Sequence, residues 1–255
     1  MKMEGVSFMV RVRDEEQTLE ACVRSLLPLR IPMEIVVVLH RCTDGSAGIV
    51  EGIAREDARI RVYEYHEELS RAGYETLATS AGSRHSIVAY DNWCFARTRL
   101  PWVFKWDADF VCTDELRAFL ESRTWPRELG KFRLAAVNST SRNGECYLAC
   151  GQVGYAKHGF WEIPLYERGA YAEVELDVAF EHRSELTTMK EYWTEAPWFE
   201  KEESDEAREV RARVAKLVET FGPEPRGLAR ASNPECDPLY RRIVDANPTF
   251  VDLYA

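Results

Sequence analysis

The sequence contains no apolar stretch that approaches the roughly 20 residues needed to cross a bilayer. Its first residues, MKMEGVSFMVRVRDEE, also lack the apolar core of a secretory signal peptide. The seven cysteines are scattered and form no Cys-x-x-Cys pair, which argues against a zinc site and favours a reducing compartment. We therefore expect a cytoplasmic protein that has no transmembrane segment and is at most peripheral to a membrane.

Positive charge is also scarce. The chain has 33 Lys and Arg against 43 Asp and Glu, which gives a formal net charge of −10. Proteins that bind a nucleic-acid backbone normally present a basic patch, so we expect no nucleic-acid partner. The hydrophobic fraction of 45% is enough for a substantial core. The length of 255 residues therefore predicts one sizeable α/β domain with an appendage.

The first 65 residues alternate between strand-like and helix-like segments. Strands are predicted at residues 6–12, 34–39 and 60–65, and helices at residues 14–27 and from the turn at 43–46 to about residue 56. The unbroken β-branched run of residues 34–39 is typical of a strand covered on both faces. This alternation predicts a Rossmann-like, doubly wound and mostly parallel sheet.

The rest of the chain predicts a domain boundary. Residues 69–83 resemble a loop, residues 85–97 a helix, and residues 102–106 a fourth strand. Thr113 is a suitable N-cap for a helix through Leu120. Strands are predicted at 132–137, 145–151 and 174–180, and the first two flank the hairpin signal Arg142-Asn143-Gly144. After residue 184 come a charged helix, about 204–220, and a Pro-rich tail. We predict a domain over residues 1–185 and a helical extension over residues 186–255 packed on it.

Asp107 and Asp109 come directly after the strand predicted at residues 102–106. In an extended chain, residues two apart project to the same side, so both carboxylates can face one point. The carboxyl end of a strand is where open α/β sheets bind their ligands. Carboxylate oxygens suit Mg²⁺ or Mn²⁺, which also bridge to substrate phosphates. A solvated acidic loop has the same pattern, so the motif alone leaves both interpretations open.

Three motifs in this order resemble the inverting, family-2-like group of GT-A-fold glycosyltransferases. Residues 6–19, VSFMVRVRDEEQTL, resemble the opening strand and helix of that family. Residues 34–46, EIVVVLHRCTDGS, resemble its second strand and turn, and Asn92-Trp93 followed by VFKWDAD resembles the segment that ends in its DXD metal motif. The resemblance covers about residues 5–125. It implies a GT-A fold and transfer of a sugar from a nucleotide-sugar donor to an acceptor hydroxyl, with inversion, in glycan or polysaccharide synthesis.

The resemblance also implies roles for single residues. Asp109 matches the ligand of the Mn²⁺ or Mg²⁺ ion that binds the donor diphosphate, and Asp107 matches the residue nearer the ribose. The positions expected to line the nucleotide site are Val10, Val12, Glu15, Leu39, His40, Asn92 and Asp107. The family often has an acid right after the second strand, whereas this chain has Leu39, followed by His40 and Arg41. Donors of the UDP, GDP and dTDP types therefore all stay open.

His182 follows a predicted strand late in the domain. Many GT-A enzymes complete the metal site with a histidine from this region, and neutral imidazole is a competent Mn²⁺ ligand. The alternative is an ordinary histidine bonded to a backbone group. We expect His182 to be a third metal ligand, beside Asp107 and Asp109.

Transfer with inversion needs a base on the acceptor hydroxyl, because an unactivated alcohol is a poor nucleophile. Several acids lie between the metal motif and His182: Glu162, Glu167, Glu173, Glu175 and Asp177. Glu162 is the first candidate because Phe160 and Trp161 flank it, and an apolar setting raises a carboxyl pKa. Glu173 is the second. Trp161, Trp193 and Trp198 are candidates for stacking on sugar rings, with burial in a core as the alternative.

Two other functions compete with sugar transfer. A sugar-nucleotide nucleotidyltransferase shares a similar sheet but needs a glycine-rich, basic loop after the first strand to hold a triphosphate. This chain has Arg13-Asp14-Glu15-Glu16 there, without a glycine. A non-catalytic sugar-binding module has no need of the paired carboxylates, and both are present.

Overall fold

The computed structural model describes residues 5–122, 131–137, 145–150, 153–158, 161–166, 173–182 and 195–223. Between residues 131 and 182 it describes the backbone of the strands. The chain divides into two compact units. The first consists of Met1–His66, Cys94–Val153 and Tyr166–Lys190, and the second of Glu67–Trp93, Gly154–Leu165 and Glu191–Ala255.

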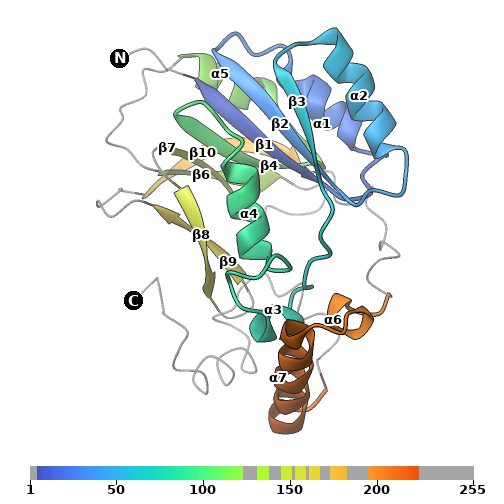
Figure 1. The fold of residues 1–255 in the computed structure, drawn as a ribbon. Helices are drawn as coiled ribbons and strands as arrows, with labels where there is room; N and C mark the ends of the chain where they lie inside the picture. Colours follow the sequence, from blue (N-terminus) through green and yellow to red (C-terminus); the bar gives the residue numbers. More distant parts are fainter. Residues whose placement is uncertain are drawn as a thin grey trace. The chain divides into compact units, whose positions relative to one another are not determined.

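An eight-stranded sheet forms the framework of the first unit, in the order β3-β2-β1-β4-β7-β6-β10-β5 (Figure 1). The strands are β1 (Val6–Val12), β2 (Met33–His40), β3 (Ile60–Tyr65), β4 (Trp102–Asp107), β5 (Phe110–Val111), β6 (Lys131–Val137), β7 (Glu145–Cys150) and β10 (Glu173–His182). β3, β2, β1 and β4 are parallel neighbours, as are β6 and β10, whereas β7 runs antiparallel to β4 and β6. The predicted α/β architecture with a mostly parallel sheet is confirmed.

The two faces of β1 carry different side chains because strand residues alternate in direction. Phe8 and Val10 face the main core, where α1 (Leu19–Leu26), α2 (Ser46–Glu56) and α5 (Asp114–Ser122) bury their apolar sides. Ser7, Met9 and Arg11 alternate with them and face the other way. Every residue of β2 is buried, which confirms the expectation that its β-branched run is covered on both faces.

The strand and helix boundaries agree with the sequence in most places, and α1 is the main exception. The helix predicted from Asp14 begins only at Leu19. Asp14 has a φ of 53°, in the left-handed region, so it stands in a turn that an α-helix cannot contain. The segment predicted as a loop over residues 69–83 contains the short helix α3 (Tyr74–Ala78). The hairpin predicted around residues 142–144 pairs β6 with β7, as expected.

In the second unit, α7 (Asp205–Phe221) packs against α3 and α6 (Trp198–Lys201). Its buried residues Ala207 and Val210 share a small core with Ala78, Trp198 and Phe199. Ser204 caps α7, since its hydroxyl accepts a hydrogen bond from the backbone of Ala207. Within the predicted extension the structure thus describes two helices, α6 and α7, and α7 packs on α3. The division at residues 185 and 186 remains a prediction.

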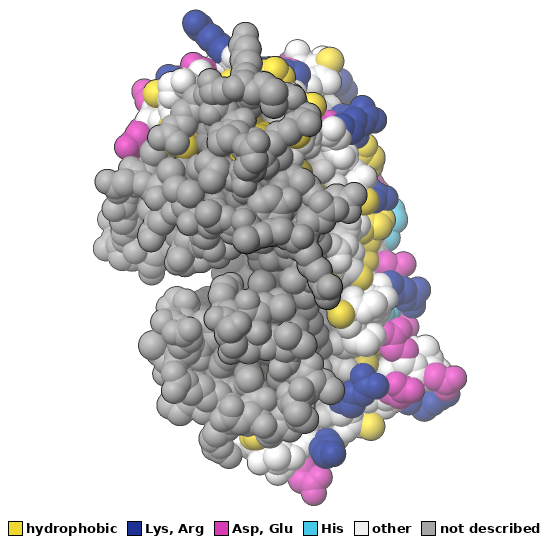
Figure 2. Space-filling view, turned by 90° about the vertical axis from the view of Figure 1, so that its left-hand side faces the viewer, with side chains coloured by type: hydrophobic (Ala, Val, Ile, Leu, Met, Phe, Trp, Pro, Cys, Tyr) yellow, Lys and Arg dark blue, Asp and Glu magenta, His cyan; other side chains and the backbone are white. Residues whose placement is uncertain are grey.

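Three further elements complete the description. α4 (Ile87–Phe95) corresponds to the helix predicted over residues 85–97. β8 (Val153–His158) and β9 (Trp161–Tyr166) form a separate two-stranded sheet. None of the described helices combines the length and the apolar character that crossing a bilayer requires. On the face drawn in Figure 2, the coloured Lys and Arg side chains lie among Asp and Glu.

Candidate active site

The Asp107-Ala108-Asp109 motif lies where β4 ends and the chain turns into β5. Asp107 is the last residue of β4, and residues 108 and 109 form the turn. Trp106 is fully buried and Ala108 is 2% exposed, so the core holds the chain on both sides of Asp107. The motif therefore stands at the carboxyl end of a central parallel strand, where the sequence predicted it and where open α/β sheets bind ligands.

Asp107 pairs with an arginine from the neighbouring strand. Arg11 and Asp107 are register partners on β1 and β4, so their side chains leave the same face of the sheet. An Nη of Arg11 donates to Oδ1 of Asp107 at 3.1 Å. The Arg11 side chain is 17% exposed and that of Asp107 is 43% exposed. A cation from the chain itself is thus in direct contact with the first carboxylate of the motif.

Cys22 of α1 contacts the backbone of this motif. Its Sγ donates to the backbone carbonyl of Asp107 at 3.6 Å. Burial raises the pKa of the Cys22 thiol, and the negative charges of Asp109, Asp107 and Glu15 add to that increase. Asp107 and Asp109 stand two residues apart at the strand end, and carboxylate oxygens of this kind suit the chemistry of Mg²⁺ or Mn²⁺.

The backbone register brings β10 to the same turn. β10 runs antiparallel to β5, and His182 is the register partner of Phe110, the residue after Asp109. The His182 backbone thus lies across from the residue that follows the Asp107-Ala108-Asp109 motif, although 72 positions separate His182 from Phe110 in the sequence. Its side chain is outside the described residues, so its role as a metal ligand remains a prediction.

The loops after β1 and β2 are locked together beside this motif. Oδ1 of Asp14 accepts hydrogen bonds from the backbone and the hydroxyl of Thr43, at 2.6 and 3.2 Å. The Glu15 backbone donates to Oγ of Ser46 at 2.8 Å, and the Gly45 backbone donates to Glu16 at 2.8 Å. These bonds fix the Arg13–Glu16 turn without a glycine, and they engage the turn's own carboxylates, Asp14 and Glu16.

Asp14, Cys42 and Asp44 form a compact group in these loops, with possible ligand atoms within 4.8 Å of one another. Their atoms are already used by the loop. Asp44 accepts hydrogen bonds from the backbones of Glu16 and Ser46, and Cys42 donates to the Val12 carbonyl. Burial acts to raise the pKa of Asp44, but hydrogen bonds from Ser46 and Glu16 outweigh it and lower the pKa. The group is therefore explained by loop structure.

The positions expected to line the nucleotide site face two directions. Val10, Val12 and Leu39 point into the helix-covered core and are 0%, 1% and 4% exposed. Any contact that they make with a nucleotide would come from their backbone. His40 lies on the opposite face of the sheet, 9% exposed, with its ring 5.9 Å from that of Tyr65.

The roles of the remaining candidates stay predictions. Glu15 has its carboxylate 3.3 Å from the Thr18 hydroxyl, which donates to it. Asn92 belongs to the second unit. For Glu162 and Glu173 the structure describes the backbone, in β9 and at the start of β10. Glu173 is nine residues before His182, about 30 Å along an extended strand, which makes it the weaker candidate for a base beside Asp109. Both assignments remain predictions.

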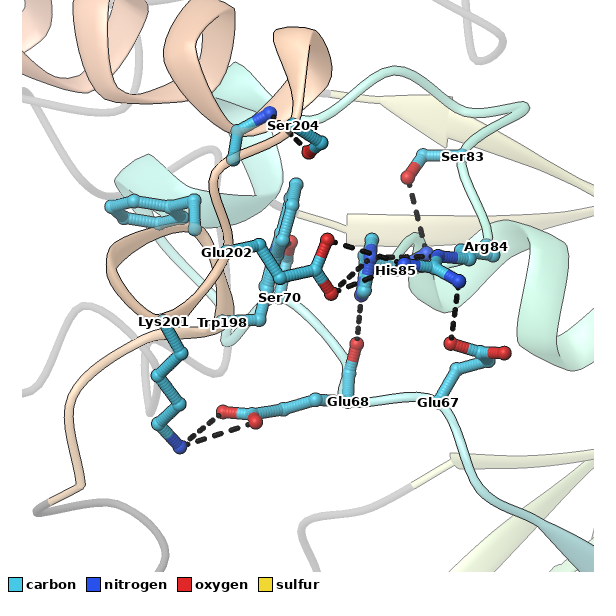
Figure 3. Close-up of polar contacts among 12 residues, drawn as sticks. Glu67, Glu68, Ser70, Ser83, Arg84, His85, Trp198, Lys201, Glu202 and Ser204 are labelled. Carbon is cyan, nitrogen blue, oxygen red and sulfur yellow. Dashed lines mark hydrogen bonds and ion pairs between the residues drawn. The ribbon is translucent and has the colours of Figure 1, made fainter.

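A second polar cluster lies in the second unit and is structural (Figure 3). His85 is 1% exposed, and its ring stacks on that of Trp198 with 3.7 Å between the ring centres. Nδ1 of His85 lies 2.7 Å from the backbone carbonyl oxygen of Glu68. Glu202 binds Arg84 at 3.2 Å, and Nε1 of Trp198 donates to Oγ of Ser70 at 2.8 Å. Trp198, one of the candidates for sugar stacking, is thus buried in a core. The side chains of Trp161 and Trp193 are outside the described residues.

We expect Cys22 to stay unmodified when the native protein is treated with iodoacetamide at pH 8. The residue is fully buried, and its raised pKa keeps it a thiol, whereas alkylation requires the thiolate. Mass spectrometry of the Cys22 peptide, with and without prior unfolding in urea, measures this protection. Equal labelling in both conditions would show that α1 does not cover the motif as described.

Comparisons with known proteins address the fold. No family model matches the sequence, and a search of curated proteins likewise finds no match. A mannosyltransferase from Pyrobaculum calidifontis, solved with GDP-Man and Mn²⁺, aligns over 99% of this chain and 77% of its own, with 14% identity and a TM-score of 0.51.

Two other solved structures align over a smaller part. TarS from S. aureus, residues 1–349, matches 56% of this chain at 18% identity and a TM-score of 0.39. Glucosyl-3-phosphoglycerate synthase from Mycobacterium tuberculosis matches 54% at 15% identity and 0.34. The matched part spans only 38% and 44% of those two chains. The alignment over nearly the whole chain with the mannosyltransferase, together with the order of strands, shows that this protein has the GT-A type of glycosyltransferase fold.

Proposed function

We propose that this chain is a metal-dependent glycosyltransferase that moves a sugar from a nucleoside-diphosphate sugar to an acceptor hydroxyl, with inversion, in glycan or polysaccharide synthesis. One observation carries the proposal. On a GT-A fold, Asp107 ends β4 and Asp109 follows in the turn, so both acids stand at the carboxyl end of a central parallel strand. Paired carboxylates at this edge suit a divalent cation that also binds a diphosphate.

The residues at the carboxyl end of β4 would have separate roles in the reaction. Asp109 would hold Mn²⁺ or Mg²⁺, with His182 as a further ligand, and Glu15 would border the nucleotide. When bound, the ion would act as a Lewis acid that stabilises the negative charge of the departing nucleoside diphosphate. Asp107, paired with Arg11, would lie nearer the ribose.

The acceptor hydroxyl must lose its proton as it attacks the sugar, so a carboxylate must lie within hydrogen-bond reach of it. Glu162 is our first candidate and Glu173 the second. Glu162 follows Trp161 at the start of β9, and it is the candidate that an apolar setting would make a stronger base.

The identity of the donor nucleotide is a separate question from the type of reaction. The mannosyltransferase that shares the fold was solved with GDP-Man and Mn²⁺, which supports including GDP sugars beside UDP and dTDP sugars. Leu39 and His40 end β2, at the position where the related family often has an acid, so uridine has no special claim here.

A donor-turnover assay tests the proposal. The full chain is incubated with UDP-, GDP- and dTDP-sugars, with Mn²⁺ or with EDTA, and released nucleoside diphosphate is measured. We expect release from one nucleotide class, and only with the metal. Pyrophosphate released from a nucleoside triphosphate and a sugar phosphate would indicate a nucleotidyltransferase instead, and saturable sugar binding without turnover would indicate a binding module.

A further inference from the structure

Arg11 brings a positive charge into contact with a motif that is expected to bind a cation. It belongs to β1, and Asp107 belongs to β4, 96 positions later in the chain. Both side chains leave the same face of the sheet, and their contact is 3.1 Å long. Arg11 is mostly buried while Asp107 is half-exposed, so the pair sits at the rim of the motif. A surface pair of long mobile side chains would contribute little, but this one is held by two central strands.

The charge of Arg11 must oppose the binding of a divalent ion at this edge. Two like charges a few ångströms apart repel each other strongly where solvent screens them only partly. The contact also occupies Oδ1 of Asp107, which an ion would have to share with the guanidinium or take from it. Asp109 lies two residues further on, in the turn that follows β4.

We propose that Arg11 is a positioning residue that engages Asp107 and thereby sets the affinity of the motif for the metal ion, leaving Asp109 as the principal carboxylate ligand. This inference rests on the metal site of the proposed function and deepens it. A free ion binds weakly to such a motif, and the negative charge of a diphosphate offsets the guanidinium. Metal and donor would then be retained together rather than the metal alone.

The test measures the affinity of the full chain for Mn²⁺ alone, by electron paramagnetic resonance of the unbound ion. Arg11→Met and Arg11→Gln remove the charge and keep much of the length, and we expect both to bind Mn²⁺ on the order of tenfold more tightly. Arg11→Lys keeps the charge and should stay close to the wild type. Arg55→Met removes a charge from α2, where the side chain is 78% exposed, and should leave the affinity unchanged.

A double-mutant cycle separates positioning from a general effect of charge. Asp107→Asn should weaken Mn²⁺ binding more in the Arg11→Met background than in the wild type, because only there does Asp107 become a ligand. Equal losses in both backgrounds would overturn the proposal. So would unchanged Mn²⁺ affinity in Arg11→Met and Arg11→Gln, or the absence of Mn²⁺ binding by both of these variants.

The outcome is separable from that of the proposed function. If Arg11 controls Mn²⁺ binding but no nucleotide sugar is turned over, the proposed function is wrong and this inference stands. If turnover depends on the metal but substitution of Arg11 leaves the Mn²⁺ affinity unchanged, this inference is wrong and the proposed function stands. If Arg11→Met does not fold, as judged by circular dichroism, Arg11→Gln and the Asp107→Asn comparison with Arg11→Lys still decide the question.

Discussion

Replacing Asp109 with Asn should lower metal-dependent release of nucleoside diphosphate by at least ~100-fold, because the variant loses the carboxylate that holds the ion against the leaving group. The fold should survive, since Asp109 lies in a turn and the core on either side of it is made by Trp106, Ala108 and Phe110. Steady-state turnover in saturating Mn²⁺ and a thermal melt measure the two effects. Binding of the nucleoside diphosphate with Mn²⁺, followed by calorimetry, should fall in parallel.

Asp114→Asn is the matched control for Asp109→Asn. It makes the same substitution five residues later, in the first turn of α5, where the side chain is 91% exposed. Turnover should be unchanged in this variant. An Asp109→Asn protein with normal Mn²⁺-dependent turnover would show that the metal site lies elsewhere in the chain.

Replacing Glu34 with Ala should cause a larger loss of folding stability than any other substitution proposed for this protein. Glu34 is the second residue of β2 and lies on the face opposite the helix-covered core, and its side chain is 11% exposed. It accepts hydrogen bonds from the Ser7 hydroxyl at 2.6 Å, from the Arg99 backbone at 2.6 Å and from the Arg61 guanidinium at 2.6 Å. Removing it would leave a largely buried guanidinium without its carboxylate.

The loss of a buried ionic partner destabilises a protein by roughly 3–5 kcal/mol. For a domain of this size that should lower the Tm by roughly 10 °C, as measured by circular dichroism. Glu34→Gln should lie between the wild type and Ala, because an amide oxygen still accepts hydrogen bonds. Glu56→Ala is the control, since Glu56 forms an ion pair with Arg24 but is 57% exposed, and its loss should hardly move the Tm. Equal Tm values for the Glu34 and Glu56 variants would contradict this account.

The strands of the first unit could be predicted because their signal is local. β1 and β3 begin and end at the residues expected from the sequence, since apolar, β-branched runs bounded by polar turns identify buried strands. The start of α1 was wrong for a non-local reason. Asp14 takes a left-handed conformation, and its carboxylate is held by Thr43, 29 residues away. Nothing in the residues around Asp14 reveals that partner.

The candidate site also has parts that the sequence predicts and parts that it does not. The position of Asp107 and Asp109 at a strand end follows from the apolar run before them. The contact of Arg11 with Asp107 was not anticipated, because it depends on the register of two strands that are distant in the sequence. A parallel alignment of residues 6–12 with residues 102–107 was the one signal that could have found it. The Glu34 cluster was missed for the same reason, since it joins β1, β2, β3 and the segment before β4.

A crystal structure of the full chain with Mn²⁺ and the nucleoside diphosphate that it binds is the most direct test of the central claim. We expect the anomalous signal of one Mn²⁺ ion beside the Asp109 carboxylate, between that carboxylate and the diphosphate, with Arg11 still close to Asp107. An ion bound instead by Asp14, Cys42 and Asp44, or a diphosphate bound away from the carboxyl end of β4, would contradict it.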